Sequence, residues 1–200
     1  MKYASIGLAL GMVVAACTTT YDPLEEYEEL TPSRIMPAPT VQPGGASAPE
    51  RELVEHGGYL VELIGCAVCH TDGALIGEPR FDDWLAGSKI GIAYSNPMKY
   101  DHPGIIFPPN LTPDPETGIG RWSDDEIASA IRHGLDRQGS KLIKAMPWLV
   151  YEKISDADSR AIVAYLRSLP PVEHKVPDNV PPGSKTEELF VHFGVYRSRR

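Results

Sequence analysis

Cys66-Ala67-Val68-Cys69-His70 is the stretch of this 200-residue sequence from which the rest can be interpreted. Two thiols at positions i and i+3 lie on one side of a helical turn, where they can bond to the two vinyl groups of a porphyrin. The histidine that follows can offer an imidazole nitrogen to the iron. Cys-x-x-Cys-His is the attachment pattern of c-type haem. The sequence therefore predicts one covalent haem c on Cys66 and Cys69, with His70 as an iron ligand.

Three other uses of paired cysteines compete with this prediction. A zinc site would need a second pair of Cys or His residues at ligand spacing, and the other histidines form none. A thioredoxin-like redox pair would require a βαβ setting, which the flanking sequence lacks. A disulfide between Cys66 and Cys69 would close only a small loop and would connect no separate parts of the fold. Haem attachment is the favoured interpretation.

Length and charge narrow the class of protein further. Two hundred residues allow one ordinary domain with additional segments. The net charge of -8 argues against a nucleic-acid partner, and there is no polybasic patch for a membrane surface. Of the three cysteines, two are assigned to haem, which leaves Cys17 to explain.

Residues 1–16 are interpreted as an export signal, because Lys2 precedes an apolar run at the extreme N-terminus that is too short to span a bilayer. The signal ends in Val14-Ala15-Ala16-Cys17, which resembles a bacterial lipoprotein box and implies cleavage before Cys17 and lipid on its thiol. Ordinary cleavage nearby, which would leave a free thiol, is the alternative. We expect a membrane-anchored lipoprotein in the bacterial periplasm, on either the inner or the outer membrane.

A lipidated, proline-rich acidic stalk is expected over residues 17–49, because its composition cannot bury a core. The stalk would act as a tether, or alternatively pack along the domain. The haem domain is expected over residues 50–172, with a C-terminal tail over residues 173–200. The tail is apolar enough around Phe190 to pack onto the domain or onto a partner, and prolines argue against helix in its first part.

Helical patterns mark both ends of the domain. Leu53, Leu60 and Ile64 recur at helical spacing before the haem motif, and Gly57-Gly58 inside this helix predict that another element packs closely there. The alternative is a shorter helix that begins after Gly58. The predicted partner is a last helix, capped by Ser155 and ended by Pro170-Pro171.

Between these ends the pattern changes. Residues 71–121 are punctuated by glycine and proline, so they are predicted to be loops that wrap the haem, with a helical turn only at residues 81–85. The sequon Asn110-Leu111-Thr112 is interpreted as structural. Ser123 and Gly134 bound a further helix. The predicted fold class is therefore all-α, with few helices and long loops around one haem.

Met146 is the candidate for the second axial ligand of the iron. It precedes Pro147, which suits the start of a short helix running to about Lys153, so the methionine projects from a constrained loop. A thioether there would complete the His/Met pair of cytochromes c. A core methionine is the ordinary alternative. Met98 and the other histidines are rival ligands.

Taken together, these motifs resemble a class I cytochrome c, in particular the haem domains of bacterial alcohol and aldehyde dehydrogenase cytochrome c subunits. The resemblance covers residues 55–172 and rests on motifs that appear in order: Gly58-Tyr59-Leu60, Gly65 to Thr71, Asn110 to Asp114, Thr117 to Gly120, Trp122-Ser123, Met146-Pro147-Trp148 and Ala164 to Pro171. It implies covalent haem c, His70 as proximal ligand and Met146 as distal ligand. Such subunits typically carry three haem domains, whereas this sequence contains one Cys-x-x-Cys-His.

The expected function is electron transfer rather than enzymatic catalysis, because an iron ligated on both sides has no open site for a substrate. Expected partners are redox proteins: a periplasmic dehydrogenase, a terminal oxidase or another cytochrome. Arg132, Arg137, Lys141 and Lys144 are candidates for a positive docking face, or for a solvated surface. The alternative function is a five-coordinate haem protein with peroxidase or gas-sensing activity, in which His102 or His133 would act on the distal side.

Overall fold

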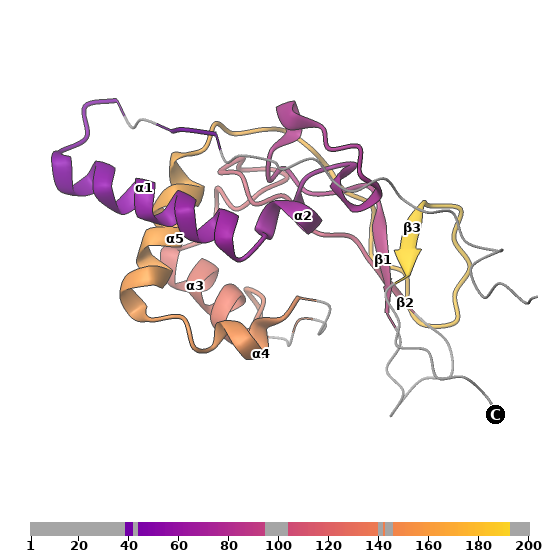
Figure 1. Ribbon diagram of the computed structural model, residues 1–200. Helices are drawn as coiled ribbons and strands as arrows, with labels where there is room; N and C mark the ends of the chain where they lie inside the picture. The colour runs from indigo at the N-terminus through magenta and orange to yellow at the C-terminus, as the bar shows by residue number, and fades with distance from the viewer. Residues whose placement is uncertain (1–38, 42–43, 95–103, 140–141, 143–145, 193–200) are drawn as a thin grey trace, which may run out of the picture. The chain divides into compact units, whose positions relative to one another are not determined.

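The computed structural model describes residues 39–41, 44–94, 104–139, 142 and 146–192. The interpretations that concern residues 1–38, Met98, His102, Lys141 and Lys144 lie outside these residues. Figure 1 shows the order of the described elements along the chain.

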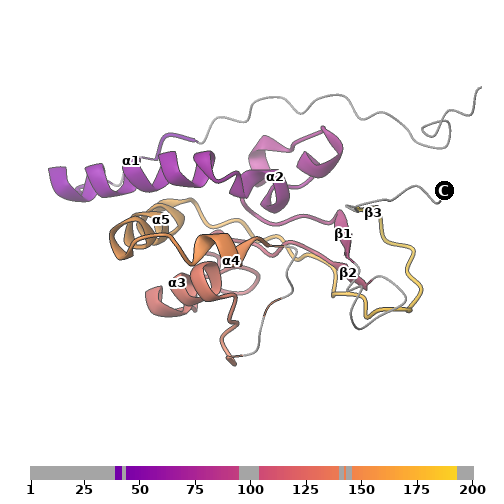
Figure 2. The ribbon, with the colours of Figure 1, turned by 60° about the horizontal axis from the view of Figure 1, so that its bottom comes forward.

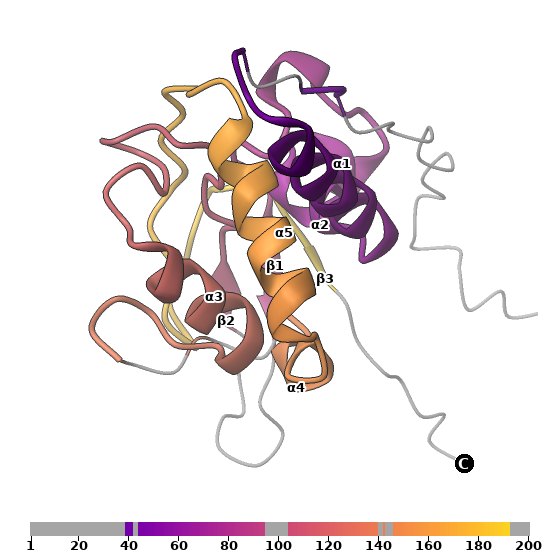
Figure 3. The same cartoon turned by 90° about the vertical axis from the view of Figure 1, so that its left-hand side faces the viewer.

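Two long helices pack against each other as the glycine pair predicts. Helix α1 (Ala48–Leu63) begins after Ser47, whose backbone N–H donates to the Glu50 carboxylate at 2.7 Å, and it runs through both glycines rather than beginning after them. It packs extensively against α5 (Asp156–Ser168) (Figures 1 and 3). A Cβ atom on Gly57 would lie 1.9 Å from the carbonyl oxygen of Ala161. Only glycine permits this close approach of the two helices.

The capping signals place the other helices. Helix α3 (Asp124–His133) begins at Ser123, which forms a capping box with Glu126, and ends at Gly134 with a φ of 62°. Helix α4 (Trp148–Tyr151) follows Pro147, which caps the helix instead of occupying its first position, and α4 is shorter than predicted. Helix α3 contacts both α4 and α5.

The expectation of an all-α fold is wrong in one respect, because the described residues include a small three-stranded sheet. Strand β1 (Gly91–Tyr94) lies between β2 (Gly104–Ile106), which pairs with it antiparallel, and β3 (Phe190–His192), which pairs with it parallel. The helices lie on one side of the described chain and the sheet on the other (Figure 2). The strands are only three or four residues long, so an alternating pattern has too few residues to be recognised.

Loops and two single turns of 3-10 helix occupy most of the segment between α2 (Cys66–His70) and α3. The turns are η1 (Ala74–Ile76) and η2 (Phe81–Asp83), and the second lies within the predicted turn at residues 81–85. The described part of the tail, residues 173–192, packs onto the domain: the Asn179 side chain accepts from the backbone N–H of Phe107 at 2.9 Å.

The described residues also bear on membrane crossing. Among their helices, none has both the length and the apolar composition that a bilayer span would require.

Candidate haem-attachment site

Helix α2 holds the three residues of the motif in one short helical segment. Gly65, with a φ of 73°, adopts the left-handed conformation, and only two residues separate the end of α1 from the start of α2. Cys66 and Cys69 are free thiols, each partly exposed. The sequence prediction that these two thiols share one turn with His70 is confirmed by the structure.

The surroundings of the thiols argue against a redox-active pair. Burial raises the pKa of the Cys66 thiol to about 12, and it also raises the pKa of Cys69. Redox-active pairs require a lowered thiol pKa, because the thiolate is the nucleophile. Protonated, partly exposed thiols instead suit attachment to a vinyl group.

A zinc site at the motif is also disfavoured by the geometry. Within the described residues, the grouping of His, Cys, Asp and Glu whose ligand atoms come within 4.8 Å of one another comprises Asp72, Asp83 and His174. That grouping contains none of the motif residues. The motif side chains therefore do not converge on one ion by themselves.

His70 is oriented by a backbone carbonyl from a distant part of the chain. Its Nδ1 atom lies 2.8 Å from the carbonyl oxygen of Pro109. Because a carbonyl can only accept, Nδ1 carries the proton and Nε2 keeps the lone pair. Burial lowers the pKa of the imidazole, although the bond to Pro109 opposes this effect. A neutral imidazole with its free lone pair on Nε2 is the form that ligates iron.

A buried polar network fixes the loop that carries this carbonyl. Asn110 is 2% exposed, and its side-chain NH₂ donates to Thr117 Oγ1 at 3.0 Å and to the Val172 carbonyl at 2.8 Å. Its side-chain oxygen accepts from the backbone N–H of Thr112 at 2.8 Å and from the hydroxyl of the same residue. The sequon therefore has the structural role that was predicted. The hydrogen bond from His70 to Pro109 was not foreseen, although Pro109 directly precedes this motif.

Two separate apolar clusters contact the two thiols. Cys66 packs against the helical cluster, which includes Val61, Leu85 and Leu166. Cys69 packs against a second cluster formed by Leu75, Ile90 and Ile92, to which the sheet contributes. A flat apolar macrocycle attached to both thiols would be contacted by both clusters, so the residues present fit covalent haem.

Met146 lies at the end of the loop that leads into α4, and its side chain is partly buried. Its backbone carbonyl accepts from the N–H of Trp148 at 2.8 Å. From α4, Tyr151 donates its hydroxyl to the carbonyl of Ile64 at 3.2 Å, which connects the segment after Met146 to the turn before α2. The structure thus connects α4, the helix that follows Met146, to the turn that precedes the haem motif. Cys17 lies outside the described residues.

Two of the four cations proposed for a docking face are paired within the domain. Arg132 forms an ion pair with Asp156 at 2.5 Å, and Arg137 forms one with Glu126 at 3.5 Å. These carboxylates offset much of the positive charge at this surface. His133, a candidate distal group in the alternative function, is exposed at the end of α3.

Comparison with known proteins gives the chain a set of relatives, although no protein-family model matches it. It is 35% identical over 176 residues to a subunit of the nicotinate dehydrogenase of Pseudomonas putida, and the match covers 86% of this chain and 12% of that protein. It is 35% identical over 137 residues to the fructose dehydrogenase cytochrome subunit of Gluconobacter japonicus, covering 68% of this chain and 25% of the relative.

A third relative is the cytochrome c subunit of the quinone alcohol dehydrogenase of Gluconobacter oxydans, 34% identical over 140 residues, with 68% of this chain and 26% of the relative covered. The chain therefore spans between 12% and 26% of the length of these three relatives. The resemblance predicted from the motifs is confirmed: the chain is similar to cytochrome c subunits of bacterial dehydrogenases. Covalently bound haem c is the cofactor that this similarity implies.

Proposed function

We propose that this chain is an electron carrier with a single haem c, which exchanges electrons with a redox protein and catalyses no reaction of its own. The observation that carries the proposal is the 2.8 Å contact between His70 Nδ1 and the Pro109 carbonyl, beside two free thiols in the same helical turn. This contact selects the tautomer and the ring orientation that an iron ligand needs.

The residues of the site have separate tasks in this proposal. Cys66 and Cys69 would hold the porphyrin through thioether bonds, and His70 Nε2 would ligate the iron. When bound, haem c supplies a one-electron iron couple whose potential the protein tunes. The two apolar clusters keep water away from the attachment site, and the Asn110 network keeps the Pro109 carbonyl in place.

Met146 is proposed as the second iron ligand. Its thioether comes from a loop that is fixed on one side by α4, and α4 is tied to the haem motif through Tyr151. A methionine that ligated the iron would leave no position for small exogenous ligands, so the chain would act as a carrier rather than as a peroxidase or gas sensor. The His/Met pair is also the set of ligands associated with a raised potential.

The partner and the location follow from other parts of the chain. The relatives are named as subunits of dehydrogenases, and this supports a bacterial dehydrogenase as the electron donor. Exposed apolar side chains would contact such a partner: Leu63 and Val68 beside and within the motif, and Leu149 and Val150 on α4. We further propose that residues 1–16 direct export to the periplasm, that lipid on Cys17 anchors the chain, and that the stalk tethers it as far as the start of α1 at Ala48.

A spectroelectrochemical titration of the holoprotein tests the proposed electron transfer. The proposal predicts one reversible one-electron step per chain, followed through the haem absorption bands. Two resolved steps would contradict a single haem, and an irreversible change would contradict a carrier. Fractionation of cells that express wild type and Cys17→Ser tests the anchor separately, because only the wild-type chain should sediment with membranes.

A further inference from the structure

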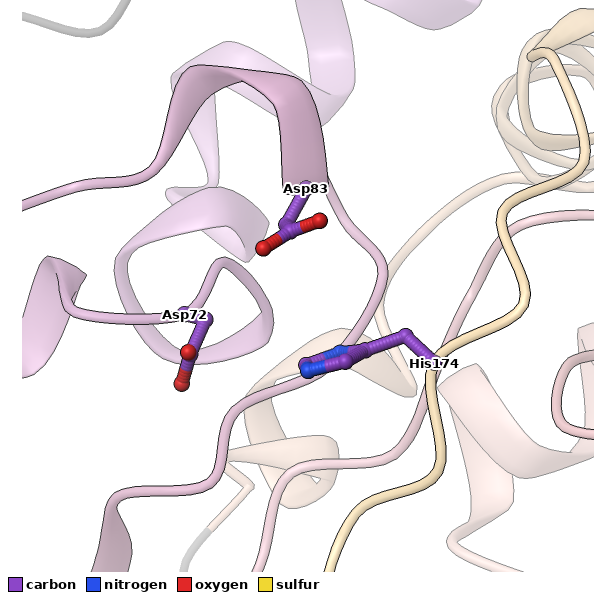
Figure 4. Close-up of side chains that lie close together, drawn as sticks. All are labelled: Asp72, Asp83 and His174. Carbon is purple, nitrogen blue, oxygen red and sulfur yellow. The ribbon is translucent and has the colours of Figure 1, made fainter.

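Three acidic and imidazole side chains converge at a place that the proposed electron transfer does not use. Asp72 follows the haem motif, Asp83 lies in η2, and His174 lies in the segment after α5. One ligand atom from each lies within 4.8 Å of the others. Figure 4 shows the imidazole ring of His174 directed toward the two carboxylates.

His174 has the features of a metal ligand, because its lone pair meets no hydrogen-bond donor among the residues that the structure describes. The residue is 8% exposed. Its Nδ1 atom lies 2.9 Å from the carbonyl oxygen of Ala86, so Nδ1 carries the proton and Nε2 holds a lone pair. Among the described residues, this buried Nε2 atom has no hydrogen-bond partner. A buried polar atom left unpaired is costly, which indicates that something else occupies the space before it.

The two carboxylates are held in place but are only partly neutralised. Asp72 accepts from the backbone N–H of Lys89 at 2.8 Å through one oxygen. Arg80 approaches the other oxygen of Asp72 at 3.8 Å and an oxygen of Asp83 at 3.0 Å. The Arg80 side chain is 65% exposed, whereas those of Asp72 and Asp83 are 10% and 17% exposed. Arg80 can therefore leave the cluster for solvent, while the carboxylates stay inside.

We propose that Asp72, Asp83 and His174 form a binding site for a divalent transition-metal ion, of which Zn²⁺ fits best. One imidazole and two carboxylates suit zinc, which accepts nitrogen and oxygen ligands. Calcium and magnesium prefer oxygen ligands alone. Three ligand atoms within 4.8 Å of one another can surround one ion, and zinc would bind them at about 2.0–2.2 Å after small adjustments of the side chains. Water would fill the remaining coordination position.

The site would join two segments that are distant in sequence, the loop after the haem motif and the segment after α5. Asp72 lies two residues after His70. The backbone N–H of His174 donates to Thr117 Oγ1 at 3.0 Å, and the same hydroxyl oxygen accepts from Asn110 in the network that fixes Pro109. An ion bound here would pin the segment after α5 to the loop that follows the haem motif. It would thereby stabilise the folded protein in proportion to its occupancy.

Calorimetric titration of Zn²⁺ into the chelator-treated holoprotein tests the proposal. The expected result is one Zn²⁺ per chain, with the affinity lowered about 100-fold or more by His174→Ala and by Asp83→Asn, since loss of an outer-shell partner alone costs about 10–100-fold. The matched control is His133→Ala, which removes an exposed histidine and should leave the binding unchanged. Absence of binding to the wild type, or equal binding by His174→Ala, would overturn the proposal.

A second variant keeps the proposal testable if the ligand variants fold poorly. Arg80→Gln removes the cation that competes for both carboxylates, so it should tighten Zn²⁺ binding several-fold while the haem spectrum stays unchanged. If the three side chains do not form a metal site, this variant binds no Zn²⁺ either, and that result would overturn the proposal. Displacement of Zn²⁺ by equimolar Ca²⁺ would overturn the assignment to transition metals. Zn²⁺ binding is measured without electron transfer, so a failure of the metal-site proposal can be distinguished from a failure of the proposed function.

Discussion

The hydroxyl of Tyr151 lies 3.2 Å from the carbonyl oxygen of Ile64, and this bond joins the segment that follows Met146 to the turn that precedes Cys66. Burial, together with the nearby Cys66 and Cys69, raises the pKa of Tyr151 to about 12. The hydroxyl therefore stays protonated and remains a donor throughout the neutral range. This bond ties α4 to the turn that precedes the haem motif.

Replacement of Tyr151 by phenylalanine should loosen that coupling. We expect the free energy of unfolding of the holoprotein to fall by about 1 kcal/mol, the net worth of one hydrogen bond. The charge-transfer band that arises from a methionine–iron bond should weaken at a lower temperature than in the wild type. Tyr59→Phe is the matched control, because that ring is 59% exposed and its loss of a hydroxyl should leave both properties unchanged. A charge-transfer band of undiminished intensity and thermal stability in Tyr151→Phe would mean that the Tyr151 hydrogen bond does not support ligation by Met146.

A methyl group at the crossing of α1 and α5 should be poorly tolerated. In Gly57→Ala the new Cβ would overlap the carbonyl oxygen of Ala161, so the two helices would have to separate. We expect the free energy of unfolding to fall by about 3 kcal/mol, as in other overpacked cores. Gly44→Ala is the control, since nothing lies within 4 Å of its added methyl group. Chemical denaturation of both variants measures the difference.

The two thiols should each contribute one covalent bond to the haem. In Cys66→Ala and in Cys69→Ala the chain would keep haem through a single thioether, and the double variant would lose it under denaturing conditions. Intact-protein mass spectrometry after unfolding measures the attached mass. Cys17→Ala serves as the control and should retain the full attachment. Haem retained covalently by the double variant would contradict the assignment of both cysteines.

Protonation of Asp114 in acid should destabilise the loop that follows Asn110. The pKa of Asp114 is lowered, first by the backbone N–H of Thr117 and then by the hydroxyl of the same residue, which donate to its carboxylate at 2.6 and 2.8 Å. A carboxyl whose pKa is lower in the folded state stabilises the protein above its unfolded pKa of about 3.9. That contribution is lost as the pH falls through the folded-state pKa.

Asp114→Asn should therefore be less stable than the wild type at neutral pH. The difference between the two should narrow below about pH 4, where the carboxyl of the unfolded chain becomes protonated, and disappear as the pH falls through the lowered pKa of the folded state. Thermal melts across this range measure the effect. An equal difference at every pH would mean that the charge of Asp114 does not contribute.

Local signals in the sequence were sufficient to predict where the longer helices lie. Ser123 and Gly134 bound α3 because a capping hydroxyl and a left-handed glycine act within one turn of the chain. The glycines of α1 predicted close packing, since a residue without a Cβ atom inside a helix is otherwise unfavourable. The haem-attachment pattern could be recognised because all of it lies within the five residues Cys66 to His70.

Relations between distant segments could not be predicted in the same way. Strand β3 pairs with β1 across about a hundred residues of chain, and each strand is too short to show a period of its own. The acceptor for His70 is a backbone carbonyl, which any residue type could supply, so no sequence pattern identifies Pro109. His174 likewise meets Asp72 only because the segment after α5 returns to the haem motif.

The most direct test of the account is to record the absorption spectra of the purified holoprotein, oxidised and reduced, with and without carbon monoxide. The account predicts a low-spin haem c with a methionine–iron charge-transfer band and no change on addition of CO. Met146→Ala should lose that band and bind CO. A high-spin iron that binds CO in the wild-type protein would contradict closure of the site by Met146 and would favour a gas-binding or peroxidase function instead.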